Sequence, residues 1–201
     1  MKTRRTLLGS IVVMGLLIAV SVIAPHGVES LLRRPELYLH AKFVHVLTVS
    51  LFLGNVVIGT LWETRSLLSK RAAIIRYTYD TVAWLDAVFT APLIVLVVVT
   101  GLMLGTIDGG VFSLAWLVVA FATFALSGLV WLAFDIPTQY RVKRLFREAP
   151  ADAAELPAAL LRVLRFRVVL NACAVMALLV VLYLMVHKPE LPAVQRWLAG
   201  R

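Results

Sequence analysis

Long apolar runs alternate with short charged segments along the whole chain. Five runs contain no Asp, Glu, Lys or Arg, and they cover residues 6–28, 43–62, 87–107, 109–134 and 168–187. Each run reaches the roughly 20 residues that a helix needs to cross a hydrocarbon core of about 30 Å. Strand-like alternation is absent from these runs. Because helices satisfy their own backbone hydrogen bonds in lipid, the pattern predicts five transmembrane helices.

The composition agrees with an integral membrane protein. The 201 residues are 61% hydrophobic and 15% charged, whereas a soluble domain is about half apolar and about a quarter charged. The only cysteine, Cys173, lies in an apolar run, which excludes a disulfide framework and a thiolate zinc site. The net charge of +9 comes from basic residues between apolar runs. We therefore expect the lipid bilayer, and not a nucleic acid, as the partner.

The first run follows a basic N-terminus, MKTRR, and so also has the outline of a secretory signal peptide. Cleavage after Ala24 would leave Pro25 at the new terminus, so we expect a retained anchor. The predicted fold is an all-α integral membrane helical bundle of two parts. Residues 1–36 form an N-terminal transmembrane anchor with a periplasmic loop, and residues 37–201 form an antiparallel four-helix membrane domain.

The basic residues predict the orientation of a multi-pass protein of the bacterial inner membrane. With the N-terminus in the cytoplasm and the C-terminus in the periplasm, fourteen of the twenty Lys and Arg residues face the cytoplasm. The interfacial tryptophans are then Trp62, Trp84 and Trp131 at cytoplasmic helix ends and Trp116 at an outer end.

Two basic segments, 63–81 and 136–166, are expected to extend the spans as helices against anionic headgroups. The alternative is that they contact a cytoplasmic protein partner. Prolines should interrupt the second segment at Pro137, Pro150 and Pro157.

Ionisable and metal-binding side chains inside lipid are costly, so each of them is a candidate functional group. In the expected topology they form two layers. The outer layer contains the four histidines of the chain and two methionines at similar heights, namely His26, His40, His45, His187, Met103 and Met185. The inner layer contains Asn55, Asp86 and Asn171, with Asp135 at the interface.

The outer layer has the side chains of a haem or copper site, because imidazole and thioether groups bind both metals. His45 lies about four residues, or roughly 6 Å, below the outer edge of its span, and His187 lies near the edge of its own span. The candidate cofactor-binding residues are therefore His45, His187, Met103 and His40, with His45 and His187 as metal ligands. The alternative is that the histidines are interfacial groups whose polar tips lie in water.

The inner layer has a simpler interpretation. Asn and Asp near helix ends form interhelical hydrogen bonds worth roughly 0.6 to 2 kcal/mol. Asp86 would pair in this way with Arg65 or Arg76. The functional alternative is that Asp86 faces a water-filled cavity, where it relays protons to a quinone or carries a transported ion.

Three stretches resemble a family of predicted bacterial integral membrane proteins whose domain has no assigned function. They are LYLHAKFVHVLTVSLFLGNVVIGTLWETRS from Leu37, YTYDTVAWLDAVFTAPLIVLVVVTGLML and ALSGLVWLAFDIPTQYRVKRLFRE. The resemblance covers residues 37–187, which is four spans.

A smaller set of residues resembles a pattern of known chemistry. Lys42, His45 and Gly54 resemble the K-x-x-H…G pattern in the first helix of HemJ-type protoporphyrinogen oxidases and, more loosely, the copper-resistance D membrane domain. This resemblance implies that His45 is a haem b ligand. The later helices depart from the HemJ catalytic pattern, so the resemblance does not extend to protoporphyrinogen oxidation.

Two hypotheses of function follow. In the first, the protein binds haem b near the periplasmic face and transfers electrons, with quinone and a membrane or periplasmic redox partner, alone or as a homo-oligomer. In the second, it is a cofactor-free membrane protein: an accessory subunit of a larger complex, a small permease or a copper-handling protein. No phosphate-binding glycine loop or nucleophile elbow supports an ATP-driven or serine-hydrolase function.

Overall fold

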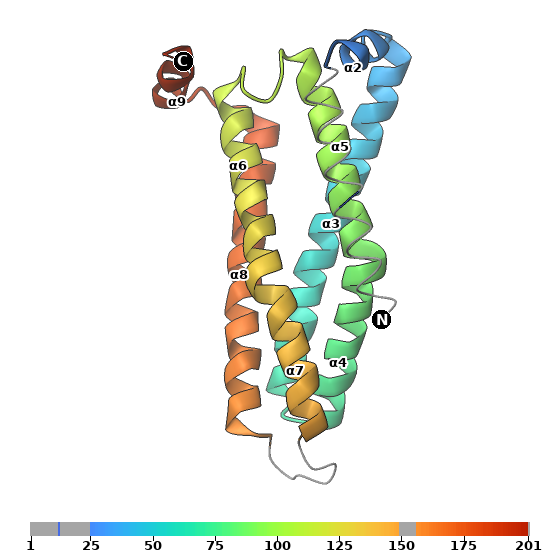
Figure 1. The fold of residues 1–201 in the computed structure, drawn as a ribbon, viewed down its shortest axis with the longest axis vertical. Helices are drawn as coiled ribbons and strands as arrows, with labels where there is room; N and C mark the ends of the chain where they lie inside the picture. The colour runs from blue at the N-terminus through green and yellow to red at the C-terminus, as the bar shows by residue number, and fades with distance from the viewer. Residues whose placement is uncertain (1–11, 13–24, 149–155, 201) are drawn as a thin grey trace.

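The computed structural model describes residues 12, 25–148 and 156–200, and this part of the chain is helical without any strand. Four helical rods run antiparallel along one long axis (Figure 1). Each is long and apolar enough to cross a membrane, and they span Pro35–Leu68, Ala72–Ile107, Ala115–Glu148 and Ala158–His187. The described residues thus confirm a helical membrane bundle. The expected first span, 6–28, lies almost wholly outside them, so the count of five stays a prediction.

The rods are assembled from successive helical elements. In chain order these are α2 (Pro25–Leu32), α3 (Pro35–Leu68), α4 (Ala72–Leu85), η1 (Asp86–Thr90), α5 (Ala91–Ile107), α6 (Ala115–Val130), η2 (Trp131–Asp135), α7 (Ile136–Glu148), α8 (Ala158–His187) and α9 (Pro192–Ala199). The four rods place α2 and α9 at one end of the bundle (Figure 1). The opposite end, which we call the basic end, contains the turn at residues 69–71, the last residues of α7 and the first residues of α8.

The second and third rods each contain one π-helical turn, η1 and η2. The N–H of Ala91 donates to the carbonyl of Asp86, and the N–H of Ile136 donates to the carbonyl of Trp131, five residues earlier in both cases. A proline follows directly, Pro92 or Pro137. Because a proline ring clashes with the carbonyl four residues before it, a widened turn lets the rod continue.

The sequence-based boundaries need two corrections. The predicted span 109–134 begins too early, because Gly109 and Gly110 have φ angles of +86° and +101° and form the turn before α6. Such angles suit glycine and end a helix. The predicted break at Pro137 is also wrong, because η2 accommodates this proline. Pro157 does precede the start of α8, as predicted, and Pro150 lies outside the described residues.

The rods pack in two pairs, α3 with α5 and α6 with α8, and α3 also contacts α8. Two apolar clusters fill the bundle. The first lies toward the basic end and consists of Ile75, Tyr79, Val142, Phe146, Leu160, Val163 and Leu164. The second lies near mid-height and is formed by Phe52, Leu93, Val97 and Leu178. Large apolar side chains also cover the outside, for example Ile58, Leu129 and Val169, each more than 60% exposed. Such a surface suits lipid.

Candidate functional site

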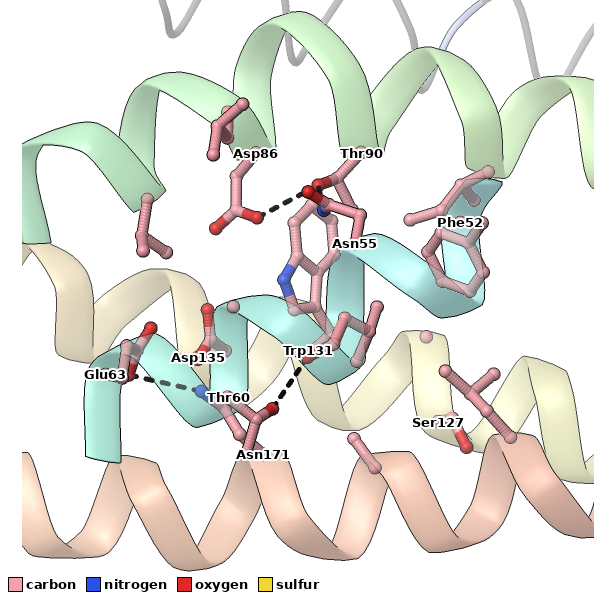
Figure 2. A pocket seen from close by; sticks show the side chains of 18 of the residues that line it. Phe52, Asn55, Thr60, Glu63, Asp86, Thr90, Ser127, Trp131, Asp135 and Asn171 are labelled. Carbon is pink, nitrogen blue, oxygen red and sulfur yellow. Dashed lines mark hydrogen bonds between the residues drawn. The ribbon is translucent and has the colours of Figure 1, made fainter. Parts of the chain in front are cut away.

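A cavity of about 120 Å³ lies inside the bundle and is lined by side chains from all four rods. Its polar side chains come from the half toward the basic end, while Phe52, Ile94, Phe124 and Leu178 form its apolar wall. The first and last residues of both π turns line it: Asp86 and Thr90, Trp131 and Asp135. Figure 2 shows these side chains projecting into the cavity from facing helices.

Arg167 of α8 joins three rods through its guanidinium group. Its Nη2 lies 3.1 Å from Oε1 of Glu63 on α3, and its Nη1 lies 3.0 Å from Oδ1 of Asp135 on η2. Nη1 also donates to the main-chain oxygen of Asp135 and to Oγ1 of Thr138, both at 3.0 Å. The exposed fractions of the Arg167, Glu63 and Asp135 side chains are 1%, 1% and 4%. One buried cation is therefore paired with two buried carboxylates, and one negative charge remains when all three groups are ionised.

Further polar contacts support this ion cluster. Asn171 Nδ2 donates to the second oxygen of Glu63, Oε2, at 3.2 Å. The guanidinium carbon of Arg167 lies 5.2 Å from the ring centroid of Tyr79, within the range of a cation–π contact. Two polar atoms of the cluster accept or donate no hydrogen bond within the described part of the chain, Asp135 Oδ1 and Arg167 Nε. Asp135 Oδ1 is left with its ion pair alone.

Asp86 lies in the same cavity but has no cation among its hydrogen-bond partners in the described residues. Its Oδ1 accepts from Oγ1 of Thr90 at 3.1 Å, and its Oδ2 accepts from Nε2 of Gln139. Gln139 Nε2 also donates to Asp135 Oδ2 at 3.0 Å, so one amide connects the two aspartates. Asn55 Nδ2 donates to Thr90 Oγ1 at 2.9 Å and extends the chain of hydrogen bonds to α3.

These contacts test the expectations for the inner layer. Interhelical hydrogen bonds are confirmed for Asn55, which bonds Thr90, and for Asn171, which bonds Glu63. The expected pairing of Asp86 with Arg65 or Arg76 is wrong, because Arg76 donates to the main-chain oxygen of Phe146 instead and Asp86 faces the cavity.

Two residues expected at the interface lie inside the bundle. Asp135 is buried beside Arg167, and Trp131 lines the cavity. The reason is that the third rod continues to Glu148, so both residues lie well before its end.

The sequence reasoning missed Glu63, Arg167 and Gln139 as site residues. Counting uncharged runs places every charge outside a span by definition, and Glu63 and Arg167 each stand one residue beyond such a run. The helices α3 and α8 continue past both residues, so the charges lie inside the bundle. An acidic and a basic residue at the same level of two spans were the signal that could have revealed the pair.

His45 of the outer layer makes a contact between two rods. Its Nδ1 lies 2.9 Å from Oγ1 of Thr100 on α5, and the side chain is half-buried. Gly101 packs against the same ring, since a Cβ atom built on this glycine would lie 3.1 Å from His45 Cε1. The glycine thus allows the imidazole to lie directly on the backbone of α5.

The other outer-layer residues have their contacts elsewhere. His187 is exposed, stacks on Tyr183 with ring centroids 4.2 Å apart, and bonds the main-chain oxygen of the same residue. His40 is exposed, and Met103 is half-buried on α5. The described contacts bring none of these three residues to His45.

His26 and the residues of the K-x-x-H…G pattern other than His45 also have their contacts elsewhere. His26 is exposed and lies 3.8 Å from Glu29. Lys42 of the K-x-x-H pattern lies over the Tyr38 ring, and Gly54 faces open space. Across the described ranges, no group of three His, Cys, Asp or Glu side chains is arranged to hold a metal ion.

Comparison with known proteins identifies the family. The family DUF2269, described as predicted integral membrane protein, matches residues 39–189. The chain belongs to this family. The match covers all four described rods except the first residues of α3, and thus includes every residue of the cavity. No curated protein and no solved structure matches the chain.

Proposed function

We propose that this protein carries protons or small cations through the membrane, with the cavity as the binding site and Asp86 as the exchangeable ligand. The proposal rests on one observation. Three carboxyl groups, Glu63, Asp86 and Asp135, share the cavity with the single guanidinium of Arg167, and Asp86 has only uncharged hydrogen-bond partners. It develops the permease alternative of the sequence analysis.

The charge balance supports this function. With all four groups ionised, the cavity would carry two net negative charges inside a bilayer. An ionised carboxylate without a cation is costly in an apolar medium, so the group binds a proton or a cation. Glu63 and Asp135 already have Arg167. Arg167 offsets only one of their two charges, so one uncompensated charge stays with that pair. The other lies on Asp86, which has no cation among its hydrogen-bond partners in the described residues and shares the Gln139 amide with Asp135.

The surroundings of the cavity also suit a carrier. The two apolar clusters described above lie on either side of the polar residues along the bundle axis, and apolar side chains beside a polar site restrict the passage of ions. Both π turns, which are frequent at functional sites, contribute cavity residues from rods that contain a proline. A helix that is already irregular at the site can bend there when access changes sides.

Proteoliposomes test the carrier function. The purified full chain is reconstituted with a pH-sensitive dye inside the vesicles, and proton uptake is measured under an imposed membrane potential. We expect uptake well above that of empty vesicles, and loss of the excess in Asp86→Asn, because the amide neither ionises nor exchanges a proton. Asp80→Asn is the matched control. Asp80 is an exposed residue of α4, and its Oδ1 lies 3.9 Å from Nζ of Lys143.

The outcomes separate a carrier from an accessory subunit. If the protein is an accessory subunit whose polar residues only hold the helices together, its vesicles should take up no more protons than empty vesicles. That result would overturn the carrier function. Equal uptake by wild type and Asp86→Asn would overturn the role of Asp86. Both vesicle preparations must contain the same amount of folded protein, as checked by size exclusion in detergent.

Haem binding is a second candidate, and one contact supports it. Thr100 engages Nδ1 of His45, which leaves Nε2 as the ring nitrogen for a metal, as partners of metal-binding histidines commonly do. The HemJ-type and copper-resistance D resemblance rests on Lys42, His45 and Gly54 and stays a prediction, as do haem b, a redox partner and a homo-oligomer. A reduced-minus-oxidised spectrum should show a Soret band that His45→Ala removes and His26→Ala retains. A colourless protein that shows no Soret shift after haem is added would overturn this second candidate function.

We also propose that the basic end faces the cytoplasm of a bacterial inner membrane, because short cytoplasmic loops collect Lys and Arg. Two single cysteines in a Cys173→Ala background test the orientation. Arg71→Cys lies at the basic end and Glu190→Cys lies at the other end, and both positions are exposed. An impermeant thiol reagent applied to intact cells should label Glu190→Cys alone. Labelling of Arg71→Cys alone would reverse the orientation.

A further inference from the structure

We infer that the solute of the cavity is a small alkylammonium ion, held between the Asp86 carboxylate and the aromatic face of Trp131. This inference rests on the proposed function and names the cation. No covalent step is involved, because the ammonium ion and a proton are alternative counterions of the Asp86 carboxylate and either one can occupy it alone.

The size of the cavity selects the class of solute. A cavity of about 120 Å³ is far larger than a bare proton requires. An apolar protein cavity of roughly 150 Å³ accepts benzene, so this cavity suits an ion of a few carbon atoms around one nitrogen. The absence of a three-ligand metal group in the described residues gives no first shell for a divalent ion.

The walls match an ion with an apolar body. Phe52 and Phe124 stand edge to face at the apolar end of the cavity, with ring centroids 6.1 Å apart. Figure 2 shows the Trp131 indole and the Asp86 carboxylate projecting into the same space. Aromatic faces attract ammonium groups through the ring quadrupole, and tryptophan does so most strongly. Methyl groups would meet Phe52 and Phe124 while the charge meets Asp86.

The single cation of the cavity does not offer a comparable site for an anion. Both terminal nitrogens of Arg167 are occupied, Nη1 by Asp135 and Thr138 and Nη2 by Glu63. Nε is the donor without a partner in the described residues, and an anionic solute there would lie beside the Glu63 and Asp135 carboxylates, which repel it. It would also lie near Asp86, which repels it. The arrangement therefore favours a cation over an anion or a neutral solute of the same shape.

Choline and 3,3-dimethyl-1-butanol provide the decisive pair of probes, because they share one shape and differ in charge. Binding of each to the purified full chain in detergent is measured by isothermal titration calorimetry. We expect choline to bind at least about tenfold more tightly than the alcohol, since about 1.4 kcal/mol of cation attraction gives that factor. Equal binding of the two probes would overturn recognition of the charge.

Variants locate the ion. Asp86→Asn and Trp131→Leu should each weaken choline binding by at least about tenfold, and Trp131→Phe should retain part of it because the π face remains. Trp84→Leu is the matched control, since Trp84 is 60% exposed and lies outside the cavity. An equal loss in Trp84→Leu would overturn the site, and so would full binding by Trp131→Leu.

The result also separates this inference from the carrier function. Absence of choline binding together with proton uptake that depends on Asp86 would overturn the ammonium inference and leave the carrier. Choline binding without any uptake would overturn the carrier and leave a binding site. Absence of both would overturn the two proposals together.

Discussion

Two polar contacts between α3 and the second rod differ in their surroundings: one is an isolated hydrogen bond, and the other is part of a network that includes charged groups. In the half of the bundle away from the basic end, His45 and Thr100 form one hydrogen bond, and Gly101 packs against the histidine ring. Ten residues further along α3, which is about 15 Å in a helix, Asn55 meets Thr90. There the contact continues through Asp86, Gln139, Asp135 and Arg167 to Glu63.

The difference between these regions lies in charge and in the number of rods. The His45 contact joins two rods without any charge that must be neutralised. The cavity layer joins all four rods and contains four ionisable groups, so removing one of them leaves others unpaired in an apolar medium. The histidine, the most conspicuous ligand in the sequence, thus lies in the simpler of the two regions. The cavity layer should be far more sensitive to substitution.

The largest effect is expected for Arg167→Met, because it leaves Glu63 and Asp135 buried without a cation. Breaking a buried ion pair from one side costs about 3 to 5 kcal/mol. The free energy of unfolding, measured in mixed micelles, should fall by that amount. Arg165→Met, an exposed position on the same helix, should leave it nearly unchanged.

A triple variant distinguishes charge from lost packing. Adding Glu63→Gln and Asp135→Asn to Arg167→Met removes the unpaired carboxylates, so part of the lost stability should return. If the triple variant is no more stable than Arg167→Met, the cost lies in the cavity left by the guanidinium, and the contrast in charge between the two regions is wrong.

A second, smaller effect tests the packing of His45. Alanine is a better helix former than glycine by about 1 kcal/mol, so Gly54→Ala, which meets open space, should stabilise the protein. At Gly101 the new methyl group would press on the His45 ring, and overpacking costs about 1 to 3 kcal/mol. Gly101→Ala should therefore be less stable than Gly54→Ala by this amount. Equal stabilities would mean that the ring does not rest on Gly101.

The sequence predicted the fold better than the site, and particular residues show why. Span length and backbone hydrogen bonding depend on local composition, so the apolar runs located all four described rods. The predicted helix boundaries were wrong where the local backbone conformation determines them. This is the case at the turn that contains Gly109 and at the π turn before Pro137. Asn55 and Asn171 were found because each is a polar residue inside an apolar run, and Asp86 was found because it borders one. Glu63 and Arg167 were missed because their partnership depends on the distance between α3 and α8, which no single run contains.

The smallest effect is expected for the hydrogen bond of His45. Thr100 and Thr123 both donate to a carbonyl of their own helix, and only Thr100 also contacts His45. Comparing Thr100→Val with Thr123→Val therefore isolates the interhelical bond, because each loses the same local bond. Such bonds in membrane proteins average about 0.6 kcal/mol and reach about 1.7, so the difference in the free energy of unfolding should lie in this range. A difference as large as that of Arg167→Met would show that His45 belongs to a charged or metal-bearing site, and it would reverse the ranking of the two regions.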